Sequence, residues 1–181
     1  MRRTLLAFGF AITTVLISTQ LYAQMGPPPT PAPELKKLDF LTGDWAAEGT
    51  MTAGPPGTPA TKWNMNTHAE WMEGNFFLVE HDDADMGTMG KSTELAVLGY
   101  DSEKKVYTYT AFSSMGEAES STGTIDGDTW TWLSNEHFGG MPMKGRYTMK
   151  VLSPTSYAMK FELSQDGTNW TTAMEGKATK K

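Results

Sequence analysis

The chain has 181 residues, a formal net charge of −6 and no cysteine. A length of this order suits one domain, and the lack of cysteine excludes disulfides, thiol catalysis and thiolate metal sites. The negative charge argues against nucleic acids and anionic membrane surfaces as partners.

The first residues are typical of a secretory signal peptide. Arg2 and Arg3 precede an apolar run over 5–17, and the segment ends in the tripeptide LYA. We therefore predict a signal peptide over 1–23, cleaved after Ala23, and a periplasmic or secreted protein with no membrane contact after cleavage. An uncleaved anchor is the alternative, but the run is shorter than the roughly 20 apolar residues that cross a bilayer.

A proline-rich stretch, QMGPPPTPAP, follows at 24–33 and predicts an extended linker before a folded domain over 34–181. Leucines recur at helical spacing over 34–41, at positions Leu35, Leu38 and Leu41. This spacing predicts a short helix or turn that covers one end of the folded domain.

From Gly43 onward, short runs alternate between apolar and polar residues, and each run ends in Gly, Pro, Asn or Asp. The pattern predicts an all-β domain with ten strands. They are 44–53, 61–71, 75–82, 92–100, 106–113, 117–125, 129–136, 145–152, 156–164 and 170–178. The short connections favour antiparallel neighbours, so we predict an up-and-down β-barrel, because closure removes both exposed edges. A β-sandwich is the alternative.

A barrel of ten strands is wider than one that eight strands fill with side chains, so we predict a central cavity. The alternation assigns most bulky apolar residues of the strands to the inner face, with Leu95 and Val97 among them. We predict that the cavity binds a small, largely apolar ligand, with one histidine as a polar contact. The predicted lining is Trp63, Met65, Trp71, Phe77, Val79, His81, Tyr147, Met149, Tyr157, Met159 and Phe161.

No catalytic residue is predicted, because the chain lacks a nucleophile elbow, a zinc-protease motif and a nucleotide-binding loop. The carboxylates of Glu70 and Glu80 are assigned to the solvated outer face. The alternative is an enzyme in which His81 or His137 acts as a base at the barrel mouth. A third possibility is a packed barrel that makes protein contacts through its outer face or linker.

Histidine, methionine and aspartate cluster at 81–89, and histidine and methionine cluster at 137–143. These donors suit copper, and the carboxylates of the first segment suit Ca²⁺. Neither segment has an established ligand spacing, so we predict flexible loops and no metal site.

Three short motifs carry a family resemblance: FLTGDW at 40–45, LGYD at 98–101 and DGTNW at 166–170. The chain after the signal peptide resembles the bacterial family DUF1579, and residues 38–49 resemble the entry motif of calycin-like, or lipocalin-like, barrels. Independently of the resemblance, Gly43 permits a sharp turn into the first strand. Trp45 then plugs the barrel end, and its indole N–H reaches a backbone carbonyl.

The opening and strand count also resemble the haem-binding nitrobindins. That resemblance implies a histidine iron ligand near the end of the barrel, but residues 170–178 contain no histidine. We therefore predict no cofactor. No element of the sequence indicates an oligomeric state.

Overall fold

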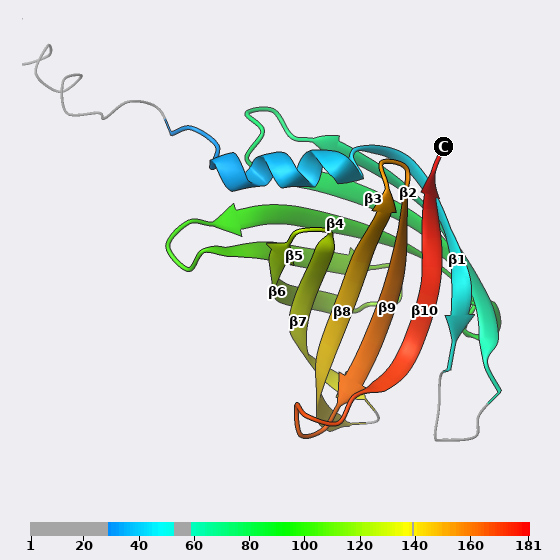
Figure 1. Ribbon diagram of the computed structural model, residues 1–181. Coiled ribbons are helices and arrows are strands. Elements are labelled where there is room, and N and C mark those ends of the chain that lie inside the picture. The colour runs from blue at the N-terminus through cyan, green and yellow to red at the C-terminus, as the bar shows by residue number, and fades with distance from the viewer. Residues whose placement is uncertain (1–28, 53–58, 139) are drawn as a thin grey trace, which may run out of the picture. The chain divides into compact units, whose positions relative to one another are not determined.

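Ten antiparallel strands close into a barrel in the computed structural model of the protein (Figure 1). The structure describes residues 29–52, 59–138 and 140–181. The predicted signal peptide, and the first half of the predicted linker, lie outside these described residues. Residues Pro31–Lys181 make up one compact unit.

Each strand pairs with its neighbours in the chain, and the first pairs with the last. The strands are β1 Gly43–Met51, β2 Thr61–Trp71, β3 Leu78–Asp85, β4 Lys91–Asp101, β5 Val106–Ser113, β6 Ala118–Asp126, β7 Thr129–Phe138, β8 Met141–Ser153, β9 Ser156–Ser164 and β10 Thr171–Lys180. Two 3₁₀ helices accompany them, η1 Pro33–Leu41 and η2 Gly87–Met89. The predicted all-β, up-and-down barrel is confirmed, and the N-terminal helix is a short 3₁₀ segment.

Two glycines make the seam between β1 and β10 thin. Gly49 lies opposite Gly176, and Trp63 of β2 lies opposite Gly49. A Cβ atom on Gly49 would lie 2.6 Å from the Cα of Gly176, and one on Gly176 would lie 2.5 Å from Cζ2 of Trp63. The indole of Trp63 therefore packs against the seam, and its Nε1 donates to the Glu175 carbonyl oxygen at 3.3 Å.

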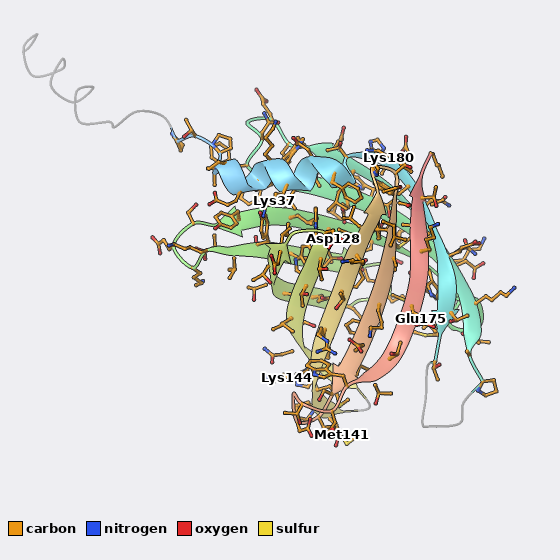
Figure 2. All side chains as sticks on the ribbon, viewed as in Figure 1. Lys37, Asp128, Met141, Lys144, Glu175 and Lys180 are labelled. Atoms are coloured by element: carbon orange, nitrogen blue, oxygen red, sulfur yellow. The ribbon has the colours of Figure 1, made fainter. Side chains whose placement is uncertain are left out.

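Helix η1 covers one end of the barrel (Figure 1). Its leucines at 35, 38 and 41 are all buried, and they form the side of the helix that packs on the barrel, as their spacing predicts. Hydrogen bonds fix its position: Tyr107 Oη donates to the Glu34 carbonyl at 2.9 Å, and Lys37 Nζ donates to the Ile125 carbonyl at 3.3 Å. We call the end of the barrel under η1 the covered end. In Figure 2, Lys37 and Lys180 lie at the covered end, and Met141 and Lys144 lie at the opposite end.

Trp45 joins η1 to the barrel. Its side chain is 2% exposed, and its Nε1 donates to the Leu41 carbonyl at 2.8 Å, as the sequence predicts. Phe40 packs on it with ring centroids 5.2 Å apart, and Tyr157 lies 5.1 Å from it on the barrel side. The covered end is therefore a packed aromatic layer.

The third motif forms the turn between β9 and β10. Asp166 accepts hydrogen bonds from the backbone N–H groups of Thr168 and Asn169, each at 2.8 Å, and these bonds lower the pKa of its carboxyl. The Trp170 ring that follows lies 4.1 Å from the guanidinium of Arg146. This tryptophan covers an ion pair on the outer wall, Arg146 with Glu162 at 2.8 Å.

Within the part of the chain that the structure describes, no helix has the length and apolar character needed to span a membrane.

A methyl group at the seam tests the closure of the barrel. We expect Gly49→Ala to lower the free energy of unfolding by about 2 kcal/mol or more, because its Cβ would overlap the Glu175 carbonyl oxygen of the neighbouring strand. Urea denaturation followed by tryptophan fluorescence measures the change. The control is Thr50→Ala at the next position, with an expected change below about 0.5 kcal/mol. Equal effects of the two substitutions would contradict this account of the seam.

Candidate functional site

Acidic side chains line part of the barrel interior. Side chains that lie directly opposite one another in paired strands share a face. Glu80 of β3 lies opposite Ala96, Ala96 lies opposite Ala111, and Ala111 lies opposite Glu119 of β6. Both alanines are at most 1% exposed, so this row belongs to the inner face.

A second row of the inner face adds two more carboxyl groups. Thr67 lies opposite Asp82, which lies opposite Glu94. Thr67 Oγ1 donates to Asp82, and Tyr109 Oη donates to Oε1 of Glu94 at 2.7 Å. We call Glu80, Asp82, Glu94 and Glu119 the carboxyl cluster.

Three members of the cluster, Glu80, Asp82 and Glu119, hold their protons more tightly than ordinary carboxyl groups do. Burial, together with the charges of Asp82 and Glu94, raises the pKa of Glu80 from 4.5 to about 8. Burial also raises the pKa of Asp82 to about 6, although the Thr67 hydrogen bond opposes the shift. The pKa of Glu119 rises to about 7 through burial and the charges of Glu136 and Glu94. The interior therefore contains protonatable groups near neutral pH.

Aromatic side chains border the same part of the interior. Burial raises the pKa values of Tyr147 and Tyr157, and the charges of Glu80 and Asp82 add to both shifts. Trp132 lies opposite Tyr147 with ring centroids 6.4 Å apart. Its side chain is 6% exposed, and its Nε1 has no hydrogen-bond partner among the described residues.

Solvent reaches the inner face from the end opposite η1, which we call the open end. Near the covered end the inner-face side chains of Leu78, Leu98 and Tyr107 are buried. Toward the open end, inner-face side chains are only half-buried, although they face the interior. They include Met65, Glu94, Glu119, Met143, Phe161 and Met174.

The structure places most of the predicted lining residues on the inner face. These residues lie on β2, β8 and β9, and the strand pairing places their side chains on the same face of the sheet. They are Trp63, Met65, Trp71, Tyr147, Met149, Tyr157, Met159 and Phe161. Of these, Trp63, Met149, Tyr157 and Met159 are buried, and Met65, Trp71, Tyr147 and Phe161 are half-buried.

The inward orientation predicted for Phe77, Val79 and His81 is wrong. Trp71 lies opposite Leu78, which is 0% exposed, so the even-numbered residues of β3 face inward. Phe77 is 46% exposed and lies against Gly99 on the outer surface. The histidine is exposed there as well.

The same shift by one residue affects β4, where Ala96 and Leu98 are buried. The predicted inner residues Leu95 and Val97 lie on the outer face, and Leu95 is 40% exposed. The physical reason is the same for both strands. Alternation shows which residues share a face of the strand, but it does not show which of the two faces is turned toward the core.

The carboxyl cluster is the part of the site that the sequence prediction missed. The sequence predicts that Glu70 and Glu80 both lie on the outer face, but only Glu70 lies there. The number of residues in the connection between β2 and β3 indicates which face of β3 is turned inward. With Trp71 inside, a connection with an even number of residues places the even-numbered residues of β3 inside. The apolar residues Phe77 and Val79 outweighed that signal.

The two segments considered for metal binding are largely strand. Alternation in β3 sends Asp82 inward and Asp83 and Asp85 outward, and β7 runs to Phe138 opposite Met141. Among the described residues, no group of three or more His, Asp or Glu side chains is arranged to hold a metal ion.

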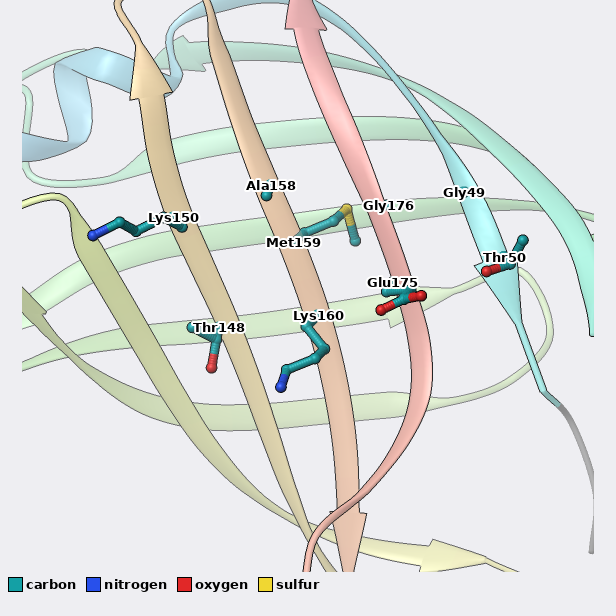
Figure 3. Close-up of a pocket in the computed structure, with 9 residues that line it drawn as sticks. All are labelled: Gly49, Thr50, Thr148, Lys150, Ala158, Met159, Lys160, Glu175 and Gly176. Atoms are coloured by element: carbon teal, nitrogen blue, oxygen red, sulfur yellow. The ribbon is translucent and has the colours of Figure 1, made fainter. Parts of the chain in front are cut away.

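Two grooves of appreciable volume lie outside the barrel. The larger, of about 500 Å³, crosses the outer wall of β1, β10, β9 and β8 (Figure 3). Its two lysines are already paired, Lys150 with Asp128 at 2.6 Å and Lys160 with Glu162 at 2.8 Å. The smaller, of about 400 Å³, lies over β2, β3 and β4. Neither groove includes a residue of the carboxyl cluster.

Comparison with known proteins agrees with this architecture. The family described as "Protein of unknown function (DUF1579)" matches residues 30–180. The chain belongs to the DUF1579 family. No match was found among the curated proteins.

Two of the solved structures that share the fold of this DUF1579 barrel match most of its length. One is Rv2717c from M. tuberculosis, with a TM-score of 0.55 and 14% identity over 83% of this chain and 99% of that chain. The other is the S-type phycobiliprotein lyase CPES from Guillardia theta, with a TM-score of 0.53 and 10% identity over 90% of this chain and 96% of that chain. At these identities the likeness concerns the fold alone.

The raised pKa values predict how the stability of this DUF1579 barrel depends on pH. Between pH 4.5 and about 8 the folded protein binds more protons than the unfolded chain, so the free energy of unfolding falls as pH rises through this window. Glu80→Gln should flatten the dependence and stabilise the protein by about 2 kcal/mol at pH 8. Denaturation at several pH values, with the outer-face variant Glu70→Gln as control, measures both effects. Identical pH slopes for Glu80→Gln and the parent protein would contradict the assignment.

Proposed function

We propose that the protein binds a small, largely apolar molecule on the inner face of the barrel, through the open end. The observation that carries the proposal is the half-buried state of inner-face side chains at that end. Met65, Phe161 and Met174 face the interior and remain accessible. Apolar surface that stays open to water in a concave site gains free energy when an apolar ligand covers it.

The contrast between the covered end and the open end of the barrel supports the same proposal. The aromatic layer under η1 stabilises the covered end, with Trp45 and Tyr157 buried there. The open end has no comparable helix among the described residues, so its interior is left to solvent or a ligand. The eight inward residues of the predicted lining form the floor and one wall of the proposed site, and Phe77, Val79 and His81 are no longer part of it.

A neutral fluorophore tests the binding. We expect Nile red to bind saturably, with a blue-shifted emission, because the proposed site removes it from water. Phe161→Ala should weaken the binding about tenfold through the loss of one aromatic contact. The control is Phe112→Ala, since Phe112 is 56% exposed, and it should leave the affinity unchanged.

The far-ultraviolet circular dichroism of both variants verifies that they are folded. The proposal fails if Nile red does not bind, or if Phe112→Ala weakens its binding while Phe161→Ala does not. The latter result would place the dye on the outer wall of the barrel.

We also propose that the chain is exported and that its mature form begins at Gln24. The basic start and the apolar run of residues 1–23 support this proposal. Expression of the whole chain in a Gram-negative host should give a periplasmic protein whose intact mass corresponds to 24–181. Val15→Asp interrupts the apolar run and should keep the precursor in the cytoplasm. An uncleaved chain in the membrane fraction would contradict the proposal.

A further inference from the structure

Among the described residues, the carboxyl cluster has no basic partner inside the barrel. The ion pairs of the described residues do not include Glu80, Asp82, Glu94 or Glu119. On the inner face of the described strands the basic side chain is Lys180, which lies at the covered end, 5.3 Å from the Trp45 ring. Carboxylates held away from bulk water require a cation or hydrogen-bond donors, so the cluster is complementary to a positively charged group.

The members of the cluster differ in how they are held. Tyr109 donates to Glu94, and Thr67 donates to Asp82. Glu80 accepts no hydrogen bond from a side chain of the described residues, and its neighbours in the same row, Ala69 and Ala96, are too small to fill the space beside it. The carboxyl of Glu119 accepts none either, so Glu80 and Glu119 are the members of the cluster left to a ligand, and Glu80 lies beside Asp82 on the inner face of β3.

An unsatisfied donor points to the same region independently. The Nε1 of Trp132 is buried without an acceptor among the described residues. The Trp132 ring lies against Gly123 of β6, which shares the inner face of that strand with Glu119. It also lies next to Tyr147, whose pKa is raised by burial and by the charges of Glu80 and Asp82. These groups therefore border one part of the interior. A buried N–H without a partner costs free energy, and an oxygen atom of a ligand would remove that cost.

We propose that the ligand is an amphiphilic amine whose protonated nitrogen contacts Glu80 and Asp82. An oxygen beside the nitrogen accepts the hydrogen bond of Trp132 Nε1. The apolar body of the ligand lies against Met65 and Phe161 toward the open end. This inference rests on the proposed function, because it names the chemical class of the molecule that the barrel binds.

The amine is chosen over a neutral or anionic head group for a physical reason. An ammonium group supplies up to three donors and a positive charge to carboxyl groups that lack a cation. A carboxylate would instead meet like charges, which repel it.

Three competitors with the same chain and different head groups test the inference. Decylamine, decanol and decanoate are titrated against bound Nile red at pH 9, where Glu80, with a pKa of about 8, is largely ionised and the amine is still protonated. We expect decylamine to displace the dye at a concentration about tenfold below that of decanol, and decanoate to be the weakest. If Nile red binds but decylamine and decanol compete equally, the inference is wrong and the proposed function stands. If Nile red does not bind, the proposed function itself fails.

A matched pair of variants distinguishes the cluster from the general negative charge of the protein. Glu80→Gln keeps the shape of the side chain and should bring the concentration of decylamine that displaces the dye to within about threefold of that of decanol. Glu70→Gln removes the same charge from the outer face and should leave the preference intact. Equal loss of preference in both variants would show long-range attraction alone and overturn the inference.

The role of Trp132 has its own test. Decylamine with a hydroxyl on the carbon beside the amine-bearing carbon should bind about threefold more tightly than decylamine itself. Trp132→Phe removes the N–H, keeps a large aromatic ring and should abolish that difference while decylamine still binds. A difference that persists in Trp132→Phe would exclude the indole as the donor.

Discussion

The pairing of β1 with β10 closes the sheet into a barrel and so gives every strand an inner and an outer face. Once the sheet is closed, each residue has neighbours on both sides, and a register slip of one residue would exchange the two faces of a whole strand. Gly49 and Gly176 permit this seam, and Trp63 packs across it. The interior therefore follows from register: apolar and aromatic at the covered end, and acidic along β3, β4 and β6.

The sequence predicts the strands and their order, but it does not predict the inner face of every strand. The ten strands and their antiparallel order follow from short alternating runs and tight turns. The role of Trp45 follows from its place after Gly43. The faces of β3 and β4 do not follow, because Phe77 and Val79 are as apolar as Leu78, and the choice between them belongs to the pairing of Trp71 with Leu78. Local hydrophobicity favoured the wrong phase, and only the register corrects it.

The acidic interior is costly for the fold. Each ionised carboxylate on the inner face loses hydration, and like charges nearby increase the cost, which is why the pKa values of Glu80 and Glu119 lie near neutral pH. Apolar side chains at these positions would pack the core more favourably. Destabilising groups in an interior that also holds an unsatisfied donor, Trp132 Nε1, are typical of sites that bind a ligand.

Stability and binding are separated along the barrel axis. At the covered end, η1 and the rings of Phe40, Trp45 and Tyr157 close the interior, and their burial offsets the cost of the carboxyl cluster. At the open end the half-buried residues contribute less to the core, so packing constrains the type of side chain there less strongly. Glu80 lies between these regions, with accessible Glu94 toward the mouth and buried Leu78 toward η1. A ligand that reaches it must therefore carry its polar group inward and leave its apolar body toward the mouth, the orientation that an amphiphilic amine would adopt.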